Sequence, residues 1–177
     1  MRKLLALVLV AAGLFSGVQY MKVRKDLLSE RRSIDADWSA VEAALEQRAM
    51  ITVDLTKTVE SEAPAESNAI LSVNDARNLL NLARDRQAKM LANARLDEAI
   101  GRLMLQVEAH PKLEHSKKYG DLLEALKGAE YQIAVSRRKY NEAVEHYNAR
   151  IELFPANVVA SVSGMHKVDA YFQTPVI

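Results

Sequence analysis

A sustained heptad spacing of apolar residues constrains the fold of this chain more than any other feature. Within residues 22–60 the steps alternate between three and four, through Ile34, Trp38, Val41, Leu45, Arg48, Thr52, Leu55 and Val59. Within 113–154 one edge recurs every seven residues at Leu126, Ile133, Tyr140, Tyr147 and Phe154, with Leu123, Val144 and Ile151 between them. A repeat near 3.5 residues over such lengths is typical of long helices packed lengthwise against other helices.

Three helix-breaking sequences divide the rest of the chain. They are SEAPAE (61–66), HP (110–111) and PAN (155–157). The segments between them, 22–60, 66–109 and 113–154, would form helices of about 55–65 Å each, and a short fourth helix is predicted over 158–172. The middle segment has apolar ends but a polar centre, ARDRQAKMLANAR (83–95), where we expect thin packing. The predicted fold is therefore all-α, an antiparallel up-and-down bundle of three long helices plus a short fourth.

The N-terminus predicts a membrane anchor. Residues 4–21 carry no charge, and as a helix they would span about 27 Å, close to the thickness of the hydrocarbon core. Tyr20 sits where an interfacial aromatic residue is expected. The alternative is a secreted signal peptide with Arg2 and Lys3 as its charged start, but no good small-x-small cleavage site follows. A retained transmembrane helix over 1–21, leading into a bundle domain over 22–177, is favoured.

Two properties of the anchor leave alternatives open. The basic residues after it (Lys22, Arg24, Lys25, Arg31 and Arg32) outnumber those before it, which favours the cytoplasm for the bundle, although a short basic N-tail often stays inside too. Gly13 and Gly17 form a G-x-x-x-G pattern. Such a pattern allows two transmembrane helices to approach closely, and it also arises from small residues in an alanine-rich span.

Polar residues follow the margin of the apolar stripes. Glu130, Arg137, Asn141 and Asn148 form one line beside the core edge, whose aromatic positions are Trp38, Tyr140, Tyr147 and Phe154. Arg48 and Arg77 interrupt the stripes of the other two segments. Because a partly buried arginine needs an acidic or amide partner, an internal network pairing these arginines with Glu130 and the two asparagines is one hypothesis. The other hypotheses are that the side chains reach water at the bundle edge, or that they form a binding or catalytic site.

Several blocks of the chain resemble the LemA family. They are Trp38-Ser39-Ala40-Val41 with QRAMITVDLTKTV (47–59), then Glu66, Val73, Ala76 and Arg77, then EAHPKL (108–113), and most specifically Glu130, Arg137, Arg138, Tyr140, Asn141, Val144, Tyr147, Asn148, Phe154 and Pro155. The tail VVASVSGMHKVDAYF is similar to the family's closing segment. Met50, Val53 and Asp54 depart from the family pattern, so this is a divergent member. The resemblance covers about 22–172. It implies a bundle of four helices on a bacterial membrane anchor, favours the internal network, and supplies no reaction.

The sequence offers little for catalysis or for metal binding. The absence of cysteine excludes disulfides, thiolate metal sites and cysteine nucleophiles. There is no H-E-x-x-H, no E-x-x-H, no glycine-rich phosphate loop and no G-x-S-x-G, and the histidines (His110, His115, His146, His166) are scattered. A net charge of +1 gives no case for nucleic-acid binding. No enzyme activity, cofactor or metal is therefore expected.

These observations favour a single-pass protein of the bacterial inner membrane. The leading prediction is a non-enzymatic helical bundle that acts as a scaffold or partner-binding module for other membrane proteins. The alternative is a membrane-organising protein that self-associates, as a homo-oligomer, through the span or the bundle. An enzyme with an unrecognised site around Glu130, Arg137, Asn141 and Asn148 is the third prediction. It requires those groups to line an open pocket without bonding to one another.

Overall fold

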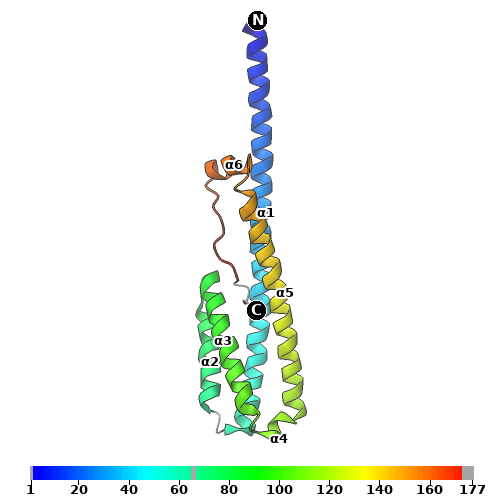
Figure 1. Cartoon of the computed structure of the whole chain (residues 1–177), viewed down its shortest axis with the longest axis vertical. Coiled ribbons are helices and arrows are strands. Elements are labelled where there is room, and N and C mark those ends of the chain that lie inside the picture. Colours follow the sequence, from blue (N-terminus) through cyan, green and yellow to red (C-terminus); the bar gives the residue numbers. More distant parts are fainter. Residues whose placement is uncertain (1, 65–66, 173–177) are drawn as a thin grey trace. The chain divides into compact units, whose positions relative to one another are not determined.

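The computed structural model describes the backbone of residues 2–64 and 67–172, and the side chains of 16–64 and 67–172 (Figure 1). The described residues form six helices and no strand: α1 (Arg2–Glu62), α2 (Ser67–Leu82), α3 (Arg86–Val107), α4 (Pro111–Glu114), α5 (Lys117–Arg150) and α6 (Ala156–Val162). The prediction of an all-α chain is confirmed.

The chain divides into two units. Unit 1 comprises residues 1–38 and 139–169, and unit 2 comprises 39–138 and 170–177. Helices α1 and α5 each contribute residues to both units.

Unit 2 contains four antiparallel helical stretches, which are α1 from residue 39, α2, α3 and α5 up to residue 138 (Figure 1). The sequence predicted a single helix over 66–109, and this prediction is wrong, because α2 and α3 fold back on each other. The break lies at 83–85, where Asp85 has extended backbone and its Oδ1 accepts a hydrogen bond from the N–H of Ala88 at 2.8 Å. This N-cap starts a new helix inside the stretch that lacks an apolar stripe.

Apolar residues of all four stretches fill the core of unit 2. Leu55 and Val59 of α1 are buried with Val73 of α2, Leu103 of α3 and Leu126 of α5. Three threonines of α1 are buried as well, and each hydroxyl donates to a carbonyl three or four residues earlier: Thr52 to Arg48, Thr56 to Val53, and Thr58 to Asp54, at 2.8–3.0 Å. Their polar groups are therefore satisfied inside the core.

Unit 1 pairs the first part of α1 with the end of α5. Trp38 and Tyr140 meet edge to face, with ring centroids 5.3 Å apart and planes at 62°. This is a favoured aromatic geometry. Tyr147 is also buried, at 1% exposed. Phe154 is 83% exposed, so its predicted core position is wrong. The reason is that α5 ends at Arg150 and the chain then turns, which breaks the heptad register before residue 154.

The fourth helix is shorter than the predicted 158–172. Helix α6 ends at Val162, and Gly164 follows with φ +66°. The N–H of Met165 bonds to the carbonyl of Ala160 at 2.9 Å, and that of Gly164 to Ser161 at 3.3 Å. This is a Schellman motif with glycine in the left-handed position, and it ends the helix.

No helix in the described part of the chain is both long and apolar enough to span a bilayer. The side chains of 1–15, which include most of the expected anchor and Gly13, lie outside the described residues. Gly17 is described, and a Cβ added there would meet no atom within 4 Å.

Candidate functional site

A cleft of about 290 Å³ opens on unit 2, and three residues of the predicted polar network, Arg48, Glu130 and Arg137, line it. Its walls come from α1, α3 and α5, and its lining residues are Arg48, Asn93, Asp97, Ile100, Gly101, Met104, Glu130, Ile133, Ala134 and Arg137. It therefore joins three helices that are far apart in sequence.

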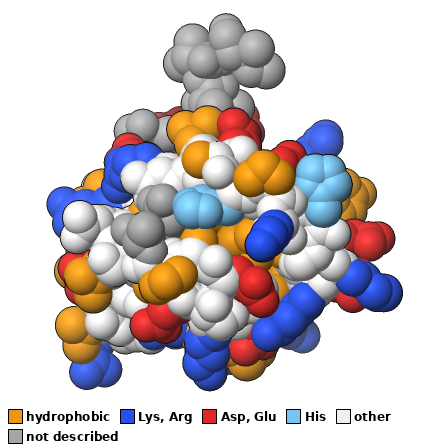
Figure 2. Space-filling view, turned by 90° about the horizontal axis from the view of Figure 1, so that it is seen from below, with side chains coloured by type: hydrophobic (Ala, Val, Ile, Leu, Met, Phe, Trp, Pro, Cys, Tyr) orange, Lys and Arg blue, Asp and Glu red, His pale blue; other side chains and the backbone are white. Residues whose placement is uncertain are grey.

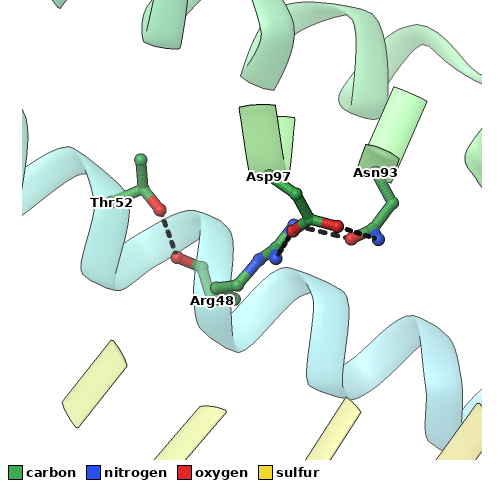
Figure 3. A network of polar contacts seen from close by, with 4 residues as sticks. All are labelled: Arg48, Thr52, Asn93 and Asp97. Atoms are coloured by element: carbon green, nitrogen blue, oxygen red, sulfur yellow. Dashed lines mark hydrogen bonds and ion pairs between the residues drawn. The ribbon is translucent and has the colours of Figure 1, made fainter. Parts of the chain in front are cut away.

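Arg48 lies at the base of the cleft and is closed in by two side chains of α3 (Figure 3). Arg48 is 2% exposed and Asn93 is 3% exposed. Nη2 of Arg48 donates to Oδ1 of Asn93 at 2.6 Å, and Nη1 forms an ion pair with Oδ1 of Asp97. Nδ2 of Asn93 in turn donates to Oδ2 of Asp97 at 3.1 Å. The three side chains thus form a closed triangle of charge-assisted hydrogen bonds.

One donor of this cluster is left over. Nε of Arg48 is buried and has no hydrogen-bond partner. An orphaned donor beside an ion pair costs free energy, so the cluster positions helices more than it stabilises them. Because α1 and α3 each supply part of the triangle, any slip of one helix along the other would break it.

Glu130 and Arg137 lie at the edge of the same cleft. Glu130 is exposed, whereas Arg137 is half-buried and its Cζ lies 4.5 Å from the centre of the Phe172 ring, a cation–π contact. Burial lowers the pKa of Arg137, the charge of Asp97 opposes this, and the positive charge of Arg48 lowers the pKa further. A guanidinium starts from so high a pKa that Arg137 keeps its charge near neutrality. The edge of the cleft therefore carries one acidic residue, Glu130, and one basic residue, Arg137.

The structure brings together only part of the predicted polar network. Arg48, Glu130 and Arg137 line one cleft, while Arg77 of α2 is not among the lining residues and has a buried Nε without a partner. Asn141 and Asn148 belong to unit 1.

Asn93 and Asp97 are the partners of Arg48, and neither residue was predicted from the sequence. A signal existed, because Asn93 lies three and seven residues before Leu96 and Ile100 and so falls on the apolar stripe of α3.

Asn148 bonds to the backbone of the segment after α6. Its Nδ2 donates to the carbonyl of Val168 at 2.9 Å, and its Oδ1 accepts from the N–H of Val168 at 2.8 Å. The side-chain amide thus pairs with the backbone as a peptide group in a sheet would. It fixes the extended segment after α6 against α5.

Unit 1 contains ion pairs between α1 and α5. Nη1 of Arg150 pairs with Oε1 of Glu30, and Nη2 with Oδ2 of Asp26 at 3.2 Å. Two acidic residues of α1 are therefore tied to the last residue of α5. These pairs are partly exposed, so each contributes little to stability.

The end of unit 2 at α4 has a mixed surface. Acidic and basic side chains alternate on this face, with apolar side chains between them (Figure 2). His115 is exposed, and its Nδ1 lies 2.7 Å from the carbonyl of Pro111. Such a mixture does not create the single-sign field that draws nucleic acid to a surface.

The described side chains of the cleft offer charges and apolar surface. Both terminal nitrogens of Arg48 are engaged by Asn93 and Asp97, and the apolar walls carry no nucleophile beside a base. Among the side chains of 16–64 and 67–172, no group of three or more histidines and carboxylates could hold a metal ion. What remains is a shallow groove with small residues, Gly101 and Ala134, and a charged edge.

Parts of this chain are similar to known proteins. Magnetosome protein MamQ 2 and Magnetosome protein MamQ 1 of Paramagnetospirillum magneticum are each 33% identical to this chain over 97 residues. That match covers 51% of this chain and 35% of the relative. Magnetosome protein MamQ of Magnetospirillum gryphiswaldense is 28% identical over 89 residues, which are 50% of this chain and 33% of that protein. The matches thus extend over about a third of these longer relatives. The model of the LemA family matches residues 37–176, and the chain belongs to the LemA family.

Proposed function

We propose that this chain is a membrane-anchored, non-catalytic helical bundle that binds a partner protein of the same membrane through the cleft of unit 2. The observation that carries the proposal is the closed Arg48–Asn93–Asp97 triangle. Because these polar groups bond to one another, they build the wall of a groove and are not available as a reactive set.

The groove suits an apolar helix with a polar flank. Met104 of α3 and Ala134 of α5 offer accessible apolar contact, and Gly101 leaves room for close approach, whereas Ile100 and Ile133 are buried. A helix laid in such a groove is a common mode of recognition. Glu130 and Arg137, at the edge, would fix its direction and register through charge.

The anchor and location are part of the proposal. The uncharged run over 4–21, followed by the basic residues Lys22, Arg24 and Lys25, supports a single span of a bacterial inner membrane with the bundle on the cytoplasmic side. A topology reporter fused after Ile177 tests this. Activity of a cytoplasm-specific reporter is expected, and activity of an exported reporter would place the bundle on the opposite side.

Filling the groove tests the partner-binding function. A leucine at Gly101 would occupy the groove, and an added Cβ there meets no atom within 4 Å, so the chain should fold normally. Gly120→Leu is the matched control, since Gly120 is also an exposed helical glycine with open space around it, outside the cleft.

The readout is crosslinking in membranes followed by quantitative identification of the captured proteins. A partner recovered with the native chain and with Gly120→Leu is expected to disappear with Gly101→Leu. Capture of the same proteins by all three chains would reject the groove as the binding surface. Recovery of nothing but abundant proteins would reject the partner-binding function itself.

A further inference from the structure

Six large apolar side chains are exposed on the segments at one end of unit 1. They are Val18 and Met21 of α1, Leu153 and Phe154 of the α5–α6 turn, and Val158 and Val162 of α6, with exposed fractions of 52–83%. We call this set the collar. Exposed large apolar side chains that gather in one region of a protein mark contacts with other proteins or with membranes.

Helix α6 has apolar side chains on two faces. Ala156, Val159 and Ala160 are buried inside unit 1, while Val158 and Val162, one helical turn apart, point outward. Asn157 and Ser161 are exposed beside these two valines, so the outward side of α6 is partly apolar and partly polar. A surface of this mixed kind suits the boundary between an apolar and a polar environment.

The collar is fixed to the end of the uncharged segment of α1. The hydroxyl of Tyr20 lies 3.0 Å from Oγ of Ser163, just after α6. An apolar cavity of about 640 Å³ separates the two helices, lined on α1 by Ser16, Gly17, Gln19, Tyr20 and Val23, and on the other side by Phe154, Pro155, Val158 and Val159. Residues 4–21 carry no charge, so these contacts place α6 beside the part of α1 where the uncharged stretch ends.

Positive charge begins at the next residue. Lys22, Arg24, Lys25 and Arg32 are exposed on α1, and they lie beside Met21 and Leu28 on the surface of this helix. A basic cluster beside an apolar patch complements anionic lipid headgroups, which attract each nearby lysine or arginine. The nearest acidic residues of α1, Asp26 and Glu30, are already paired with Arg150.

We propose that the collar is a second membrane contact, in which α6 and the α5–α6 turn lie in the boundary between headgroups and acyl chains. Phe154, Val158 and Val162 face lipid, and the basic cluster binds anionic headgroups. This is the arrangement of an interfacial apolar helix with charged flanks. Lipid acyl chains fill the cavity between α1 and α6. The inference rests on the proposed membrane anchor, and it adds that unit 1 is held at the bilayer surface by two segments of the chain.

The absence of cysteine allows a direct test on the full chain. Val158→Cys and Val162→Cys, each labelled with a polarity-sensitive fluorophore, report on the collar. Met50→Cys is the matched control, because Met50 is a large apolar residue of similar exposure, 66%, in unit 2. Leu9→Cys reports separately on the anchor. The proteins are reconstituted into phosphatidylcholine vesicles, with and without a quarter of phosphatidylglycerol, containing lipids with a spin label at the headgroup or deep in the acyl chain.

Labels at Val158 and Val162 are expected to shift to the blue and to be quenched by the shallow spin label, while the label at Met50 is quenched by neither. Phosphatidylglycerol should strengthen the quenching at Val158, and Lys22→Gln with Arg24→Gln and Lys25→Gln should remove that increase. Equal quenching in both lipid mixtures would overturn the role of the basic cluster.

The remaining outcomes separate the inference from the function on which it rests. No quenching at Val158 overturns the collar contact, and quenching at Leu9 by the deep label in the same sample leaves the anchor standing. A blue shift at Val158 without lipid quenching, which grows with protein concentration, also overturns it and assigns the collar to a second copy of the chain. No quenching at Leu9 rejects the anchor itself.

Discussion

The side chain of Asn148 and the backbone of Val168 exchange two hydrogen bonds, 2.9 Å and 2.8 Å long, inside unit 1. Asn148 is 9% exposed and Val168 is 6% exposed, so water cannot readily replace either bond. Between residues 166 and 172, the described part of the segment that follows, the backbone is not helical. The two bonds of Asn148 therefore supply one attachment of this segment to α5, in addition to the ion pair of Lys167 with Glu152.

Asn148→Ala should release the segment around Val168. The change leaves a buried N–H and a buried C=O without partners, which costs about 1–3 kcal/mol of stability. We expect faster hydrogen exchange at the amide of Val168 and faster proteolysis after Gly164. Gln132→Ala, at an exposed position of α5, is the control and should change neither rate. Unchanged exchange at Val168 in the Asn148 variant would mean that the two bonds do not hold the segment.

The Arg48–Asp97 pair predicts an asymmetry between its two halves. Arg48 is 2% exposed and the Asp97 side chain is 46% exposed. Asp97→Ala leaves a buried cation with Asn93 as its one side-chain partner, whereas Arg48→Met leaves a carboxylate that water can reach. We therefore expect Asp97→Ala to lower the free energy of unfolding by about 1–3 kcal/mol and Arg48→Met to cost less. Chemical denaturation in detergent, followed by circular dichroism, measures both. An equal or larger loss for Arg48→Met would contradict this account of the pair.

Local periodicity explains how much of the fold could be predicted. The heptad stripes of α1 and α5 depend on residues close in sequence, and they identified Val41, Leu55, Tyr140 and Val144 as core positions, all of which are buried. The end of α6 was not predicted, since the fourth helix was expected to run through Gly164 to residue 172, although a glycine is the residue that the terminating motif needs. The break after α2 was harder to predict, since no proline or glycine marks it. It depends on one side-chain bond from Asp85 and on packing of α2 against α3.

The candidate site was predictable only in outline. Arg48 was found because it interrupts an apolar stripe, and Arg137 because it lies on the polar line beside the core edge. Their neighbours were not, because Asn93, Asp97 and Phe172 come from other parts of the chain and are brought close by tertiary packing alone. Asn148 was placed on the polar line beside the core edge, but its bonds to the backbone of Val168 were not predicted, because sequence patterns of side chains do not reveal backbone partners.

Asp85→Ala should loosen the hairpin between α2 and α3. The Asp85 carboxylate caps α3 through the N–H of Ala88, and loss of such a cap costs about 0.5–2 kcal/mol. We expect faster hydrogen exchange in the first turn of α3 and a lower denaturation midpoint. Asp75→Ala removes an exposed carboxylate within α2 and serves as the control. A midpoint as low for Asp75→Ala as for Asp85→Ala would show that charge, and not capping, sets the effect.

Alkaline pH should destabilise the chain through two tyrosines. Burial raises the pKa of Tyr147, with Arg31 opposing and Glu30 adding to the shift. Burial also raises the pKa of Tyr119, and Glu114 and Glu108 add to it. Because the folded pKa exceeds the unfolded value of about 10, the unfolded chain loses these protons first, and stability falls as pH rises from about 10 through the folded pKa.

The denaturation midpoint measured across alkaline pH tests this expectation. Replacing Tyr119 and Tyr147 together by phenylalanine should make the midpoint fall less steeply as the pH rises. The ultraviolet absorbance of phenolate should then show fewer tyrosines that ionise only at the highest pH. Tyr131→Phe, at an exposed position, is the control. A decline that is equally steep in the double variant would assign the alkaline instability to other groups.

Truncation of Tyr140 should destabilise the chain strongly and truncation of Phe154 hardly at all, although both residues lie on one heptad edge of the sequence. Tyr140 is 0% exposed and packs against Trp38, so Tyr140→Ala should cost about 3–5 kcal/mol through lost burial and the cavity left behind. Phe154 is 83% exposed, and Phe154→Ala should change stability by less than about 0.5 kcal/mol.

Trp38 is the single tryptophan of the chain, so its fluorescence during denaturation reports on this contact in both variants. A red shift of Trp38 in the folded Tyr140 variant is expected and none in the Phe154 variant. A cost at Phe154 comparable to that at Tyr140 would mean that residue 154 belongs to the core after all, as the heptad alone predicted.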